Sequence, residues 1–362
     1  MKKHYFWTIA FFYAIVVFYL AATTPISPHE AKTLFTADTL VTLLMKWGEG
    51  ISDTLFGLRL FFISAGFLSI ILFYQLSKRV CSKPEDTYLA TFIFMLLPGI
   101  LTGTMLANIA IIVLPVVLLF VLMYEKGYFW SLPFLMLILF FIHEASIIFF
   151  IAVLLYAVAQ KDKALSIVSL AFLLAFIYLA KGIVIGGRPS GHFLEIFGLY
   201  ATLFSPFLFL YFFYALYRIL LRGKKTLLWY ISFTALAFSL LLSLRQKIHI
   251  TDFAPYMMIA VPLMISVFNH SMRVRLPQFQ KPYRMGAYFI LFTLILNALV
   301  IMTHKVSYYR TGLSDKHFAK RIYGPYDKVQ ELKAAGIECY NPPQRSESYQ
   351  FQYYHMPVCN KK

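Results

Sequence analysis

Two adjacent histidine–glutamate pairs, His29-Glu30 and His143-Glu144, stand at the ends of long apolar segments of this 362-residue chain. An imidazole or a carboxylate in such a place can act as a general base, accepting a proton from a hydroxyl or an amine. A carboxylate can also ligate a divalent cation. These four residues are therefore the candidate catalytic groups, and a requirement for a divalent cation stays open.

The first pair also has a purely structural interpretation. Ser27-Pro28-His29-Glu30 is typical of a helix start, with Ser27 as the N-cap, Pro28 in the first turn and Glu30 near the positive end of the helix dipole. His143 likewise has a local capping alternative. Residue spacing leaves both interpretations open.

Five basic side chains near the ends of apolar segments are candidate substrate-binding groups. Cations of this kind form charge-assisted hydrogen bonds with the phosphate of a lipid. The alternative role is ordinary anchoring at a membrane interface. The five residues are Arg59, Arg188, Arg245, Lys247 and His249.

The elements that must position these residues are membrane-spanning helices. Of all residues 60% are apolar and only 14% are charged, and only helices satisfy their own backbone in lipid when runs of this length cross a bilayer. The sequence predicts an all-α polytopic bundle of about eleven helices within residues 1–302. They are expected at 5–22, 54–76, 88–102, 107–124, 128–142, 145–159, 164–180, 199–221, 226–243, 255–269 and 285–302.

Basic residues orient this bundle. With a cytoplasmic amino terminus, sixteen fall in inner loops and six in the short outer loops, the bias expected of a membrane protein. The inner set is Lys2, Lys3, Lys78, Arg79, Lys83, Lys126, Lys161, Lys163, Arg218, Arg222, Lys224, Lys225, Arg273, Arg275, Lys281 and Arg284. The net charge of +17 is thereby explained by topology, without a nucleic-acid partner.

The orientation requires a hairpin between Lys126 and Lys161, with His143-Glu144 at its outer tip. A single helix over this stretch would bury that pair in lipid and invert every later loop. All candidate groups then gather at outer helix ends, which indicates a reaction at the outer membrane face. A bacterial inner membrane is the expected location.

The polar tail, residues 303–362, is expected outside the membrane. It holds Cys339 and Cys359, and an oxidising compartment favours a disulfide between them, with unpaired thiols as the alternative. Residues 326–335 are predicted to form a short helix with Val329 and Leu332 on one face, ended by Gly336.

The segment Pro28-His29-Glu30-Ala31 after the first helix resembles the Asp-Glu loop of membrane glycosyltransferases of the C superfamily, which includes the protein O-mannosyltransferases and the lipid A aminoarabinose transferase. Gly57-Leu58-Arg59-Leu60, Leu76-Ser77-Lys78-Arg79, Pro98 and the segment 245–262 are similar in the same way. The resemblance implies a polyprenyl-phosphate sugar donor, a lipid or glycan acceptor and contact with membrane lipids. It implies Glu30 as general base, although His29 replaces the first acid of the family's pair.

Two other functions are compatible with the sequence. Phe141-Ile142-His143-Glu144-Ala145-Ser146 resembles the His-Ser helix start of exopolysaccharide and O-antigen polymerases. A lipid or solute transporter without chemistry is the other alternative. The scarcity of ionisable residues inside the helices counts against a transporter, because coupled transporters usually carry such groups at mid-membrane.

Overall fold

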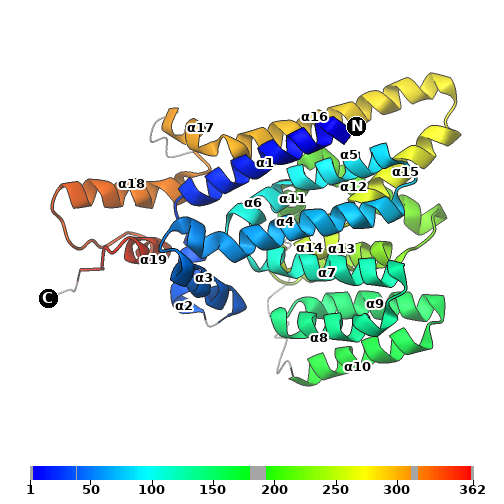
Figure 1. The fold of residues 1–362 in the computed structure, drawn as a ribbon, viewed down its shortest axis with the longest axis horizontal. Coiled ribbons are helices and arrows are strands. Elements are labelled where there is room, and N and C mark those ends of the chain that lie inside the picture. Colours follow the sequence, from blue (N-terminus) through cyan, green and yellow to red (C-terminus); the bar gives the residue numbers. More distant parts are fainter. Residues whose placement is uncertain (1–2, 38, 180–192, 311–316, 360–362) are drawn as a thin grey trace. The chain divides into compact units, whose positions relative to one another are not determined.

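The computed structural model describes residues 3–37, 39–179, 193–310 and 317–359 (Figure 1). All regular secondary structure in these ranges is helical, which confirms the predicted all-α class. Arg188 lies outside the described residues.

The chain divides into two compact units. Unit 1 is Met1–Ala10, Ala65–Leu101 and Ile109–Ala298, and unit 2 is Phe11–Ser64, Thr102–Asn108 and Leu299–Lys362. The predicted boundary at residue 302 therefore stays a prediction, but the tail shares its unit with the segment that follows the first helix.

The α-helices of unit 1 are α5 Pro84–Leu96, α7 Ile109–Lys126, α8 Leu132–Ile142, α9 Ser146–Gln160, α10 Lys163–Leu179, α11 Phe193–Phe204, α12 Pro206–Arg222, α13 Leu227–Ser243, α14 Ala254–Met258 and α15 Val261–Val274. Two 3-10 turns accompany them, η1 Phe129–Ser131 and η2 Ile250–Asp252. Unit 2 contains α2 Pro28–Thr36, α3 Leu40–Ile51, α17 His304–Arg310, α18 Lys320–Ala334 and α19 Arg345–Tyr353. Four helices have residues in both units: α1 Lys3–Thr23, α4 Leu55–Val80, α6 Pro98–Met105 and α16 Pro277–Met302.

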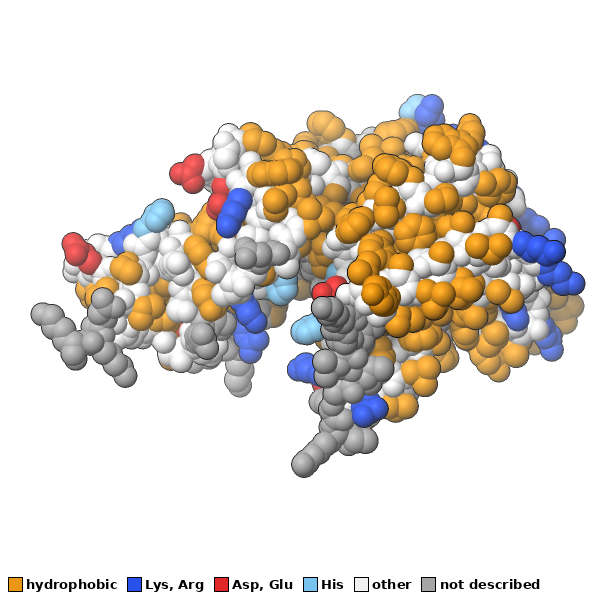
Figure 2. All heavy atoms as spheres, turned by 90° about the horizontal axis from the view of Figure 1, so that it is seen from below, with side chains coloured by type: hydrophobic (Ala, Val, Ile, Leu, Met, Phe, Trp, Pro, Cys, Tyr) orange, Lys and Arg blue, Asp and Glu red, His pale blue; other side chains and the backbone are white. Residues whose placement is uncertain are grey.

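The protein is a membrane protein by the length and apolarity of these helices. Among the described residues, five helices are long and apolar enough to cross a bilayer, and two bent helix pairs raise this to seven if each pair is one span. Four shorter apolar helices account for the remaining predicted segments. Hydrophobic side chains are spread over much of the face drawn in Figure 2, as expected for a protein in contact with lipid.

Two predicted helices are broken by proline. The segment predicted at 88–102 is α5 followed by α6, bent by 57° at Pro98, and that at 199–221 is α11 followed by α12, bent by 105° at Pro206. A proline ring cannot donate the helical hydrogen bond and disfavours helical geometry in the residue before it. Ser205, the residue before Pro206, has a positive φ of 80°.

The long loop predicted after the first span is instead folded, as α2 and α3. Helix α2 packs against α3 and against the tail helix α19 (Figure 1). Glycines allow α3 to approach α4 closely, because a Cβ on Gly48 would lie 2.1 Å from the carbonyl oxygen of Gly57. The connection between the first two spans is thus a packed part of unit 2.

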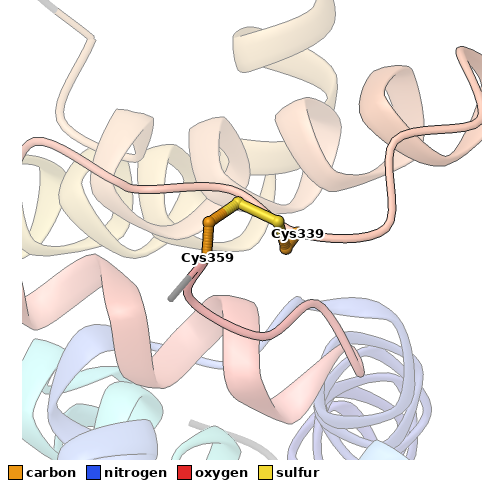
Figure 3. The surroundings of a disulfide bond; sticks show 2 residues. All are labelled: Cys339 and Cys359. Atoms are coloured by element: carbon orange, nitrogen blue, oxygen red, sulfur yellow. A yellow bond between two sulfur atoms is a disulfide. The ribbon is translucent and has the colours of Figure 1, made fainter. Parts of the chain in front are cut away.

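The tail carries its own small core. Val329 and Leu332 of α18 pack with Phe351 and Met356 around α19. Helix α18 begins earlier than the predicted helix at 326–335, and Gly336 follows it with a φ of +73°, as its predicted role in ending the helix requires. A disulfide joins Cys339 and Cys359, whose Cα atoms are 5.0 Å apart (Figure 3).

In unit 1 the predicted hairpin between Lys126 and Lys161 is present as α8 and α9. Helix α9 packs against α8, α10 and α13 (Figure 1). Its core includes Phe149 and Phe150, both fully buried. His143 ends α8, so the polar pair lies in the turn of the hairpin as the sequence predicts.

Candidate functional site

Glu30 and Arg59 form a buried ion pair in unit 2. Arg59 Nη2 donates to Glu30 Oε2 at 2.8 Å, and Arg59 Nε donates to Oε1 at 2.8 Å. The two side chains are 1% and 0% exposed. Two parallel bonds between a guanidinium and a carboxylate are the strongest common form of this interaction.

Local sequence brings Glu30 to this position. Ser27 is the N-cap of α2, its Oγ accepts from the backbone N–H of Glu30, and the Ser27 N–H donates to Glu30 Oε2 at 2.9 Å. This reciprocal arrangement is a capping box. The segment therefore starts a helix, as the structural interpretation of its sequence predicted. A catalytic role for the segment stays a separate question.

Every polar atom of the pair is occupied. Besides Arg59 and Ser27, the Glu30 carboxylate accepts from the backbone N–H of Ala107 at 2.7 Å. The remaining donors of Arg59 bind the carbonyl oxygens of Ala21, Thr24 and Pro25. A guanidinium has five N–H groups, and in this conformation none is left for a phosphate.

Burial by itself would raise the pKa of Glu30. The charge of Arg59 and the hydrogen bonds from Arg59, Ala107 and Ser27 outweigh it, so the pKa of the carboxyl lies below its ordinary value. A carboxylate with a lowered pKa and four hydrogen bonds is a weak base. In this conformation Glu30 and Arg59 therefore join the end of α1, the start of α2, α4 and the segment before α7.

His29 directly precedes Glu30 in the chain, and its side chain is exposed. The same segment is held from the other side by the tail. Tyr354 Oη accepts from the backbone N–H of Ile26 at 3.0 Å, and Gln350 Nε2 donates to the Ile26 carbonyl at 2.8 Å. The tail thus positions the segment that presents His29, a role that the sequence did not indicate.

A second candidate cluster lies in unit 1, where the α8–α9 hairpin meets the connection before α14. His143 Nε2 is 3.3 Å from Asp252 Oδ1, and the side chains are 16% and 31% exposed. The ring nitrogen is not aligned for a hydrogen bond. Beneath the pair, Tyr256 Oη donates to Ser146 Oγ at 3.4 Å in a fully buried contact. Sequence reasoning selected His143 but did not pair it with Asp252.

The predicted basic cluster lies on the same connection. Arg245, Lys247 and His249 are exposed, and Lys247 Nζ lies 3.0 Å from Glu195 Oε1. Glu144 is exposed in the hairpin turn. Within the described part of the chain no group of three or more His, Cys, Asp and Glu side chains converges as metal ligands would.

Comparisons with known proteins support the fold. A scan against protein-family models found no match, and a search of curated proteins found none either. Among solved structures, the chain is similar to ArnT from Cupriavidus metallidurans in its apo state, with 13% sequence identity and a TM-score of 0.53. The match covers 91% of this chain and 68% of ArnT. The chain therefore has a fold similar to that of ArnT.

Proposed function

We propose that this protein is a membrane glycosyltransferase that moves a sugar from a polyprenyl-phosphate donor to a lipid or glycan acceptor at the outer membrane face. The observation that supports it is the ArnT-like fold, because ArnT is the lipid A aminoarabinose transferase that the sequence also resembles. In the reaction an acceptor oxygen forms a bond to the anomeric carbon while the bond from that carbon to the donor phosphate breaks. The acceptor proton passes to a base, and polyprenyl phosphate leaves.

The proposed base is His29, with Glu30 and Arg59 as positioning residues. Glu30 was the sole carboxylate expected from the family's acidic loop, but its oxygens are occupied by Arg59 and two backbone groups. The exposed imidazole of His29 occupies the first position of that loop. A base at this position is expected to contribute about 10²–10⁴-fold to the rate.

The test is single-sugar transfer by the purified protein, with a polyprenyl-phosphate sugar as donor. His29→Ala should lose about 10²-fold or more of the rate and keep a monodisperse, folded protein. His143→Ala is the matched variant in unit 1, and retention of its activity would assign the base to unit 2. Full activity in His29→Ala would remove His29 from the mechanism.

A second candidate function is polymerisation of a glycan. It is favoured by the proximity of His143 and Asp252 directly before α9, whose first residue is Ser146. A partly exposed histidine beside a carboxylate can exchange protons with an acceptor hydroxyl. Products resolved by mass distinguish the two functions: a ladder that is lost in His143→Ala indicates a polymerase, and one added sugar indicates a transferase.

The proposed location is a bacterial inner membrane, with the amino terminus in the cytoplasm and residues 303–362 as a periplasmic tail. The bias of basic residues supports this orientation. Arg245, Lys247 and His249 would then bind the donor phosphate at the outer face, and Arg188 is a further candidate. Reporter fusions after Lys225 should report the cytoplasm and fusions after Tyr309 the outer compartment; the reverse result would overturn the orientation.

A further inference from the structure

Unit 1 contains a cavity of about 400 Å³ between α5, α12, α15 and α16. Its walls are mainly apolar and include Ile93, Leu208, Met264, Ile265 and Ile290. This volume is in the range of small-molecule and lipid sites. None of the candidate catalytic or substrate-binding residues lines the cavity.

Polar residues line the part of the cavity formed by the first turn of α5, the end of α15 and the early turns of α16. Asn269 Nδ2 donates to Asp86 Oδ2 at 2.8 Å, so the ends of α15 and α5 meet there. Arg284 of α16 completes this polar end. Asp86 is the only acid among the lining residues, and its carboxylate is already bonded to Asn269.

A second guanidinium stands at the same end. The Cζ atom of Arg275 lies 4.1 Å from the ring centroid of Tyr283, which lines the cavity. The Nε atom of Arg275 is buried and has no hydrogen-bond acceptor among the described residues. A buried donor without an acceptor costs free energy unless a ligand supplies one. Arg275 and Arg284 against a single carboxylate make this end net positive.

The cavity is accessible from the molecular surface along α16. Gly286 and Tyr288, both lining residues, are exposed, Tyr288 by 67%. Neighbouring apolar side chains such as Phe289 and Phe292 are exposed as well, as expected for a helix in contact with lipid. A molecule of the bilayer can therefore enter laterally.

We propose that this groove binds one anionic phospholipid, with an acyl chain between the apolar walls and the phosphate on Arg275 and Arg284. Basic pockets between transmembrane helices on the cytoplasmic side are typical sites for anionic head groups. In the proposed orientation this end faces the cytoplasm. The site lies apart from the proposed sugar transfer, so its failure leaves that reaction untouched.

The test uses the full-length protein in neutral detergent, titrated with dioleoylphosphatidylglycerol and observed by native mass spectrometry. One lipid should bind at saturation, at least tenfold more tightly than dioleoylphosphatidylcholine. Glycerol 3-phosphate should not compete, because it lacks the chains. Equal affinity for the two lipids would overturn the anionic assignment, and tenfold tighter binding of polyprenyl phosphate would overturn the assignment to a phospholipid.

Matched variants locate the site. Gly286→Phe should fill the groove and weaken binding at least tenfold, since a Cβ at Gly286 meets no atom within 4 Å. The double change Arg275→Gln with Arg284→Gln should weaken it similarly. Gly198→Phe, also at a helical glycine with open space, and Lys224→Gln are the controls and should bind normally.

Unchanged binding in the groove variants would refute the site. Gel filtration establishes that each variant is folded. If Gly286→Phe or the double variant fails that check, Gly286→Leu and the single change Arg284→Gln decide the question by the same criterion.

Discussion

The Glu30–Arg59 pair of unit 2 and the His143–Asp252 pair of unit 1 each join a basic and an acidic side chain, but their surroundings differ. The first is buried and bidentate, and all of its donors and acceptors are occupied. The second is partly exposed, 3.3 Å apart and not aligned for a hydrogen bond. Charges that are fully desolvated and paired hold segments together, whereas charges in contact with water remain free to exchange protons.

The largest expected effect is loss of stability when the buried pair is broken. Arg59→Ala leaves the Glu30 carboxylate buried without its counter-charge, which should cost about 3–5 kcal/mol. Arg59→Lys should also destabilise the protein, because an ammonium has three donors for five acceptors. Thermal unfolding in detergent measures both. Wild-type stability in Arg59→Ala would contradict a structural role for the pair.

The second-largest loss of stability is expected in the tail, which binds the backbone of Ile26. Opening the Cys339–Cys359 disulfide, whose cysteines are 20 residues apart, should lower the free energy of unfolding by about 3 kcal/mol. Cys339→Ser tests the loss by thermal unfolding, and Cys81→Ser, at the remaining cysteine, is the matched control. Alkylation with and without reductant measures the bond itself: free thiols at both positions in protein from an oxidising compartment would show that it does not form.

Acid should reveal the lowered pKa of Glu30. Above its ordinary value of 4.5, Glu30 is ionised in both folded and unfolded chains, and the pair contributes fully to stability. As the pH falls from 4.5 through the lower pKa of the folded state, unfolded chains bind the proton first, so stability is lost. The unfolding temperature between pH 6 and pH 3 should therefore decrease more steeply in the wild type than in Glu30→Gln. Glu144→Gln, which changes an exposed carboxylate, should keep the wild-type slope.

The smallest effect is expected in unit 1. Asp252→Asn removes the carboxylate beside His143, and a contact between two partly exposed side chains contributes only about 0.2–1 kcal/mol. The unfolding temperature should hardly change. A loss of stability as large as that in Arg59→Ala would contradict the expectation that the buried pair contributes more than the partly exposed one.

The sequence predicted the general positions of the helices well and their breaks less well. The hairpin turn at His143 followed from the charge pattern, and Gly336 was recognised as the end of a tail helix. Pro98 was noted as a helix end although the predicted helix ran on to residue 102, and the bend at Pro206 was missed, because apolar length alone does not reveal whether one run forms one helix or two. The start of α2 at Ser27 was one of the two interpretations of its motif, whereas α3, Leu40–Ile51, was not predicted.

Part of the candidate site was also readable from the residues. Ser27, Pro28 and Glu30 predict the helix start because a capping box is local, spanning four positions. The partner of Glu30 was not predictable in this way. Arg59 is 29 residues away, and no local rule states which of several cations near a helix end will reach a given carboxylate.

By itself the sequence determined that this chain is an all-helical membrane protein, because long apolar runs with few charges can satisfy their backbone in lipid only as helices. It also determined which residue types were available for chemistry. Only the tertiary structure decided that Glu30 and Arg59 are enclosed and mutually satisfied while His29, Lys247 and Asp252 remain accessible to water. The reason is that burial and pairing depend on which distant segments pack together, and those contacts are properties of the folded chain.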